Sequence, residues 1–107
     1  MTVKIETSEN SIHASLEGEL DHHSAKEIRE EIDNRVSIEK PPELILDFQN
    51  VTFMDSSGIG LVMGRYRLLK TYGGELKVIN TSPQITKVMK LAGLDRLAGI
   101  HERSAKK

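Results

Sequence analysis

Strand-like runs alternate with helical patterns along almost the whole chain. VKIETS and SIHASLEG each alternate apolar and polar residues, and Glu9 and Asn10 between them favour a tight turn, so residues 3–16 are predicted to form a β-hairpin. Residues 22–36 then repeat apolar side chains at helical spacing. ELILDF and ELKVIN are again strand-like, and a helical pattern follows each of them. This order predicts an α/β fold.

The first predicted helix, residues 22–36, places three apolar residues on one face: Ile28, Ile32 and Val36. Two alternative caps stand near its start. Ser24 and Glu27 have the spacing of a capping box, and Asp21 is an alternative N-cap. The prolines of SIEKPP end the helix.

Two further helices are predicted from the same spacing. The one over residues 57–71 has an apolar face made of Ile59, Val62, Met63, Tyr66 and Leu69, and it ends at Gly73 and Gly74. The other starts with Ser82 as N-cap and Pro83 at the first helical position, and stops at Gly93. Its apolar residues are Ile85, Val88, Met89 and Leu91.

ELILDF is a continuous apolar run, which is typical of a strand buried on both faces. It is therefore predicted to be the central strand of a mixed, largely parallel sheet in which only the first strand is antiparallel. LAGIH, residues 97–101, is predicted to add a short last strand. With 107 residues the chain is large enough for one hydrophobic core, and a single domain over 1–107 is expected.

Composition excludes several kinds of chemistry. The chain has no cysteine, so disulfides, thiolate zinc sites and cysteine nucleophiles are excluded. His22 and His23 are adjacent and point apart on a helix, which is unsuitable for a metal site. No segment approaches the roughly 18 apolar residues of a membrane span, and the start lacks the apolar core of a signal peptide. A cytoplasmic protein without metal or cofactor is expected.

Charge is distributed unevenly along the chain. Residues 1–55 contain 13 acidic and 5 basic residues, whereas residues 56–107 contain 3 acidic and 10 basic residues. The basic residues are scattered singly and no aromatic residues are interleaved with them, so nucleic-acid binding is not expected. Solvated helix faces beside an acidic neighbour, or a charged protein partner, explain this distribution better.

The segment MDSSGIG, residues 54–60, joins the predicted central strand to the helix that follows it. At such a position free backbone N–H groups and the helix dipole face outward. Asp55, Ser56 or Ser57 can each cap the helix, and one cap is enough. Gly58 and Gly60 are expected to leave room for a partner or for a bulky group such as a phosphate. A functional loop is therefore favoured over a simple cap.

Enzymatic alternatives fit this segment less well. Gly58, Gly60 and Gly64 resemble a dinucleotide fingerprint, but the third glycine comes one residue late, and Asn80 rather than an acidic residue ends the next strand. Ser56 lacks the preceding glycine of a nucleophile elbow, and no histidine stands at a spacing that marks it as the base. His13 is expected to face solvent. Neither catalytic nor metal-binding residues are predicted.

Four segments occur in an order that resembles the anti-sigma-factor antagonists of the STAS-domain family: GELDHHSAKEIREEID, LILDFQNVTFMDSSGIGLVMGRYRLLK, GGELKVIN and SPQITKVMKLAGLDRL. The resemblance covers about residues 3–101, and its two most specific segments, GELDHH and FMDSSG, are especially similar to the sporulation branch of the family. The helical and strand patterns by themselves suit many α/β domains.

The resemblance implies a non-enzymatic switch. The unphosphorylated protein would bind an anti-sigma factor that is also a serine kinase and release the sigma factor; phosphorylation would end binding, and a serine phosphatase would restore it. The acceptor in this family falls on Ser56, and the partner-binding surface on Asp21, Asp55, Ser57, Gly58 and Ile59.

Two alternatives remain open on the sequence: a STAS regulator of a stress-response or transport system, and a nucleotide-binding domain. The chain also departs from the family at its end. After the last predicted strand it has only HERSAKK, so the closing helix of the family is expected to be absent or reduced to a turn.

Overall fold

A computed structural model of the protein describes residues 2–104. Within this range the chain forms β1 (Thr2–Thr7), β2 (Ser11–Leu20), α1 (His22–Glu39), β3 (Glu43–Met54), α2 (Ser56–Lys70), β4 (Glu75–Thr81), α3 (Pro83–Leu91), the 3₁₀ turn η1 (Leu94–Arg96) and β5 (Gly99–Glu102). The predicted α/β order is confirmed, and the last strand begins two residues later than expected. Residues 105–107, on which the expectation of a missing closing helix partly depends, lie outside the described residues.

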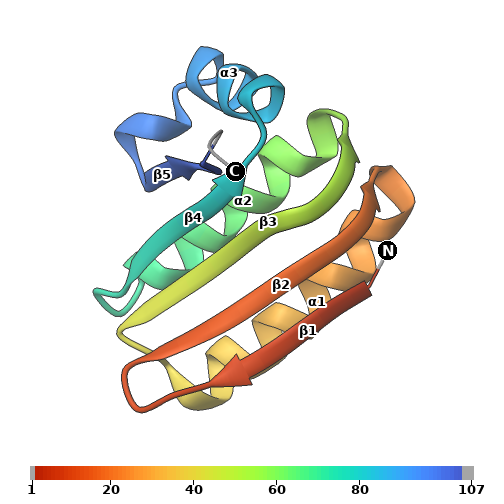
Figure 1. Cartoon of the computed structure of the whole chain (residues 1–107). Coiled ribbons are helices and arrows are strands. Elements are labelled where there is room, and N and C mark those ends of the chain that lie inside the picture. The colour runs from red at the N-terminus through yellow and green to blue at the C-terminus, as the bar shows by residue number, and fades with distance from the viewer. Residues whose placement is uncertain (1, 105–107) are drawn as a thin grey trace.

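The five strands form one sheet in the order β1-β2-β3-β4-β5, so their order in space follows their order in the chain (Figure 1). β1 pairs antiparallel with β2, and every other pair is parallel. The prediction of a mixed, largely parallel sheet with an N-terminal hairpin is therefore confirmed. β3 is the central strand, as its apolar run predicts.

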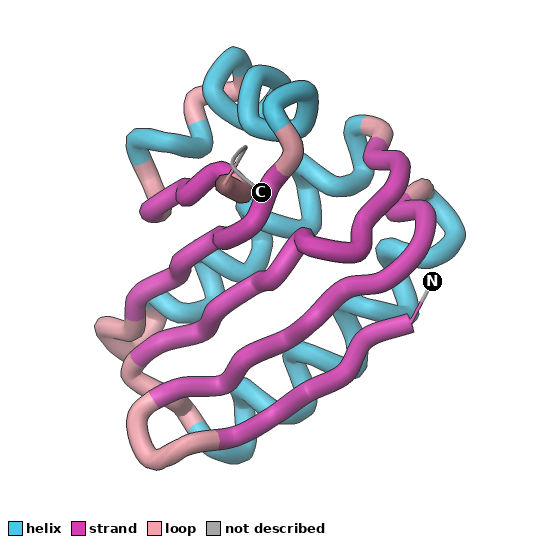
Figure 2. Tube along the Cα trace, in the orientation of Figure 1, coloured by secondary structure: helices cyan, strands magenta, loops and turns pink. Residues whose placement is uncertain are grey.

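Both long helices, α1 and α2, cover the same face of the sheet, and α3 lies beyond the end of β4 (Figure 2). The opposite face is open. In β3, Leu44, Leu46 and Phe48 are fully buried against the helices, while the alternating Ile45 and Asp47 are only half-buried. The prediction that this strand is buried on both faces is wrong. Burial alternates along β3, but the half-buried position 45 is occupied by the apolar Ile45, so the sequence reads as a continuous apolar run.

Residues from the sheet and from all three α-helices fill the core. Ile28, Ile32 and Val36 of α1 are buried as predicted. The buried face of α2 is rotated from the predicted one, since it consists of Gly58, Leu61, Val62, Arg65 and Leu69. In α3, Ile85 and Met89 are buried, but Val88 and Leu91 are exposed, which the spacing alone did not indicate.

A buried ion pair joins α1 to α2. The Arg65 side chain is almost fully buried, and its Nε lies 2.8 Å from Oδ1 of Asp33. Arg65 also donates to the carbonyl oxygen of Leu61 at 3.3 Å. Burial raises the pKa of Asp33 and lowers that of Arg65, and the opposite charge of each partner counteracts both shifts. Because removal of Asp33 would leave the buried charge of Arg65 unpaired, this pair contributes to the packing of α1 against α2.

None of the helices in the described part of the chain combines the length and the apolar character that a membrane span requires.

Candidate functional site

Asp55 connects β3 to α2 and caps the helix. Its backbone is extended, and its Oδ1 accepts a hydrogen bond of 2.8 Å from the backbone N–H of Ser57. Its own N–H donates to the carbonyl oxygen of Leu20 at 3.2 Å, which ties this turn to the end of β2. Capping at this position thus involves Asp55, and the hydroxyl groups of the two serines take no part in it.

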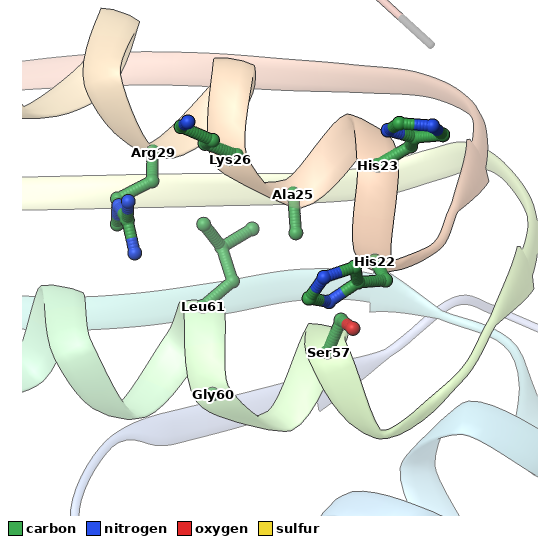
Figure 3. Close-up of a pocket in the computed structure, with 8 residues that line it drawn as sticks. All are labelled: His22, His23, Ala25, Lys26, Arg29, Ser57, Gly60 and Leu61. Atoms are coloured by element: carbon green, nitrogen blue, oxygen red, sulfur yellow. The ribbon is translucent and has the colours of Figure 1, made fainter.

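Ser56 and Ser57 have different environments although they are adjacent. Ser56, the first residue of α2, is exposed. Ser57 is half-buried, and its side chain points into the space between α1 and α2, toward His22 (Figure 3). The hydroxyl of Ser56 is therefore the more accessible of the two.

Asp21 caps α1 as Asp55 caps α2, but through a reciprocal capping box. Its Oδ1 accepts from the backbone N–H of Ser24 at 2.9 Å, and its own N–H donates to the Ser24 hydroxyl at 3.0 Å. The capping box is thus made by Asp21 and Ser24, and the alternative with Glu27 is wrong. The backbone and side-chain hydrogen bonds from Ser24 lower the pKa of Asp21.

Gly58 is required by the fold and does not open a space for a partner. It is buried in the first turn of α2, and a Cβ added there would overlap the side chain of Met54 and lie 3.1 Å from Leu20. The expectation that Gly58 leaves room for an external group is wrong, since the ends of β2 and β3 fill that space. Ile59 is half-buried and packs against the core.

Gly60 and Gly64 differ from Gly58 in this respect. A Cβ added at either position meets nothing within 4 Å. Both lie inside α2, where glycine is less favourable than alanine by about 1 kcal/mol. Contacts within the described chain give no steric reason for glycine at these two positions.

A groove of about 540 Å³ runs between α1 and α2 next to the serines. Its lining residues are His22, His23, Ala25, Lys26 and Arg29 from α1, and Ser57, Gly60 and Leu61 from α2 (Figure 3). Nitrogen-bearing side chains thus stand on one wall and small or apolar residues on the other. Sequence reasoning did not find this groove, because it depends on how the two helices pack.

A second polar cluster lies on the open face of the sheet. His13 Nε2 is 3.0 Å from Oδ2 of Asp47, and Asn80 donates to Oδ1 of Asp47 at 3.0 Å. His13 therefore contacts a carboxylate, and the expectation that it simply faces solvent is incomplete. Burial raises the pKa of Asp47, but the hydrogen bonds from Asn80, from the Gln49 N–H and from His13 outweigh it, so the net shift is downward.

Among the described residues, no group of three or more histidine, aspartate or glutamate side chains has the arrangement of a metal site. The predicted site residues form two sets in the structure. Asp21, Asp55, Ser56 and Ser57 lie at the carboxyl ends of β2 and β3, whereas Gly58 and Ile59 face inward and support this turn.

Comparisons with known proteins agree with this geometry. The STAS-domain family model matches residues 2–106. An anti-sigma F factor antagonist of Paenibacillus polymyxa is 30% identical over 95% of this chain and 87% of the relative. An anti-sigma-B factor antagonist of Bacillus subtilis is 30% identical over 97% of this chain and 94% of the relative.

Solved structures agree as well. The unphosphorylated form of the anti-sigma factor antagonist SpoIIAA superimposes with a TM-score of 0.81 at 34% identity, over 92% of this chain and 87% of that one. The phosphorylated form of the Bacillus cell fate determinant SpoIIAA gives a TM-score of 0.75 at the same identity, over 92% of this chain and 90% of that one. These matches confirm the predicted resemblance to anti-sigma-factor antagonists. The chain therefore belongs to the STAS-domain family.

Proposed function

We propose that the protein is an anti-sigma-factor antagonist controlled by phosphorylation of Ser56. The unmodified protein binds an anti-sigma factor that is also a serine kinase, and the sigma factor is released. The kinase transfers the γ-phosphoryl group of ATP to Oγ of Ser56, leaving ADP and ending the complex. A serine phosphatase hydrolyses the phosphate ester and restores the binding form.

The observation that carries this proposal is the exposed hydroxyl of Ser56 at the start of α2, next to the cap Asp55. The similarity to solved antagonist structures in unphosphorylated and phosphorylated forms supports it. Ser57 is a poorer acceptor, because its side chain is half-buried and faces α1.

The fold of this protein is expected to tolerate the phosphate. At a helix N-terminus a phosphate gains free N–H donors and a favourable dipole, worth roughly 0.3–2 kcal/mol. A partner is expected not to tolerate it, because about 1.5–2 negative charges are added beside Asp55. Burying such an imperfectly paired charge at an interface costs about 2–5 kcal/mol.

The proposed partner surface consists of two neighbouring turns, one containing Asp21 and the other containing Asp55, Ser56 and Ser57. Gly58 and Ile59 contribute to it by packing the turn against β2 and β3 rather than by direct contact. Asp21 belongs to this surface because it follows the strand next to the one that Asp55 follows.

The protein is proposed to act as a regulatory partner without catalytic chemistry of its own, in the cytoplasm, where transcription takes place. Sporulation is the proposed process, since relatives from Paenibacillus polymyxa and Lysinibacillus sphaericus carry the name anti-sigma F factor antagonist. The anti-sigma-B factor antagonists among the relatives favour a stress-response regulator as the second candidate.

The proposal is tested by adding purified protein to a preformed complex of anti-sigma factor and sigma factor. Unmodified protein should release the sigma factor in size-exclusion chromatography, and protein phosphorylated on Ser56 should not. The F-type and B-type complexes are assayed in parallel, which distinguishes the two candidate processes. Failure to release either sigma factor, or release by both forms of the protein, would contradict the proposal.

A further inference from the structure

The groove between α1 and α2 has a positively charged wall that extends away from Ser56. Lys26 and Arg29 are exposed on α1, one helical turn apart, with His22 nearer the start of the helix. No carboxylate lines this groove. The carboxylates of Asp21 and Glu27 line a separate hollow on another side of α1. In the first two turns of α1 the cations Lys26 and Arg29 thus lie on the side of α2, and Asp33, further along that side, is paired with Arg65.

The opposite wall, which α2 forms, consists of Ser57, Gly60 and the buried Leu61, and the first two are small. Ser57 and Gly60 line the groove, and Gly64 follows one turn later on the same side of α2. Because nothing lies within 4 Å of a Cβ at Gly60 or Gly64, the backbone of α2 is accessible there. These glycines lower helix stability without serving internal packing, so close approach of another chain is the physical reason that remains.

We propose that an acidic segment of the protein partner docks in this groove, with its backbone against Gly60 and Gly64 and its carboxylates on Lys26 and Arg29. The inference rests on the proposed function, in which that partner is the anti-sigma factor. Ser57 lines the groove and adjoins Ser56, so the groove is continuous with the proposed partner surface. Modification and docking are therefore coupled, because a phosphate at Ser56 places negative charge at the entrance used by an acidic segment.

The glycines provide the sharper test, since the two expected effects have opposite signs. Gly60→Ala and Gly64→Ala should raise the thermal midpoint of the free protein by several degrees. The same variants should bind the anti-sigma factor three- to tenfold more weakly in calorimetric titration, and Gly60→Leu more than thirtyfold more weakly. If a glycine served only the fold, its replacement by alanine would lower the thermal midpoint. The folded variant would then bind the anti-sigma factor as tightly as the wild type.

The charged wall is tested by Lys26→Glu and Arg29→Glu. Each should weaken binding about tenfold or more, with a loss that shrinks as ionic strength rises. Lys4→Glu is the matched control, because Lys4 is an exposed lysine on β1, whose alternation directs it to the open face of the sheet. It should change affinity less than twofold.

Each outcome decides the inference. If the wild-type protein and all groove variants bind the anti-sigma factor equally well, the inference that an acidic segment docks in the groove is wrong, and the proposed function stands. If wild-type protein binds no anti-sigma factor, both are wrong. ATP is titrated alone as a separate probe; micromolar binding to the free protein that is lost in Lys26→Glu would assign the groove to a nucleotide phosphate and overturn the acidic segment.

Discussion

Leu20 and Met54 are paired in register at the ends of the neighbouring parallel strands β2 and β3, and each is followed by an aspartate that caps a helix. Asp21 and Asp55 therefore emerge together at one edge of the sheet. Parallel pairing produces this arrangement, because both strands end and both helices begin on the same side. Ser56 adds its hydroxyl to this edge at the first residue of α2.

Phosphorylation is expected on Ser56 alone. With a cognate kinase and ATP, peptide mapping should place one phosphate on Ser56, and Ser56→Ala should abolish labelling. Ser57→Ala is the matched control and should leave labelling largely intact, because the Ser57 hydroxyl is turned toward α1. A phosphate found on Ser57 or Ser24 would contradict the assignment.

The phosphate should act locally. Phosphorylated protein is expected to bind the anti-sigma factor roughly thirtyfold to several-thousandfold more weakly, which corresponds to the cost of an imperfectly paired interface charge. Ser56→Asp should reproduce only part of this loss, because a carboxylate has about half the charge. Amide NMR spectra of the free forms should differ near residues 20–24 and 54–60 only. Shifts spread over the whole sheet would show a refolded domain instead.

Two substitutions of Asp21 can distinguish its role as the N-cap of α1 from the role of its negative charge in partner binding. Asp21→Ala should lower the thermal midpoint, because both hydrogen bonds of the capping box with Ser24 are affected, and should also weaken partner binding. Asp21→Asn retains a good N-cap, so it should keep the midpoint close to that of the wild type and show the binding effect alone. Normal affinity of Asp21→Asn would restrict Asp21 to a structural role.

Replacement by alanine should destabilise the protein at Gly58, whereas it should stabilise the protein at Gly60. Gly58→Ala introduces a Cβ that overlaps Met54, and overpacking of this kind lowers the free energy of unfolding by about 1–3 kcal/mol. Urea denaturation measures the loss. Met54→Ala in the same protein should make the Gly58→Ala change less costly, because it removes the overlapping side chain. Additive losses in the double variant would show that the strain lies elsewhere.

The free energy of unfolding should depend on pH in the acidic range because of Asp47. Its pKa lies below the ordinary value of 3.8, so the folded state binds a proton less readily than the unfolded chain. The contribution is fully present above that value and is lost as pH falls through the lower folded pKa. Asp47→Asn should therefore flatten the decline of unfolding free energy below about pH 4 in urea titrations. An unchanged acid slope would show that other carboxylates determine it.

Patterns along the chain predicted the element order, the hairpin and the position of the D-S-S-G turn, because each depends on neighbouring residues only. They failed where tertiary packing decides. Arg65 lies on the buried side of α2, which no apolar periodicity indicates, because Asp33 on α1 compensates its charge. The fit of Gly58 depends on packing for the same reason, since the side chains that would meet a Cβ there are those of Met54 at the end of β3 and Leu20 at the end of β2.

The polar cluster of His13, Asp47 and Asn80 is only in part predictable from the sequence. His13 and Asp47 occupy alternating positions that face away from the helices, so they share the open face of the sheet. Their contact depends on the register between β2 and β3, in which Ser15 is paired with Asp47. That register follows from the packed sheet rather than from the sequence of either strand.

The strand order has a consequence for how the protein meets other molecules. Because the strands follow one another in chain order, the acidic residues of 2–55 and the basic residues of 56–104 occupy opposite flanks of the sheet. The molecule is thus an electric dipole directed across its strands, although its formal net charge is only −1. In the field of a charged partner such a body experiences a torque before contact. The protein would turn toward one orientation during diffusion, and that rotation would be lost in concentrated salt.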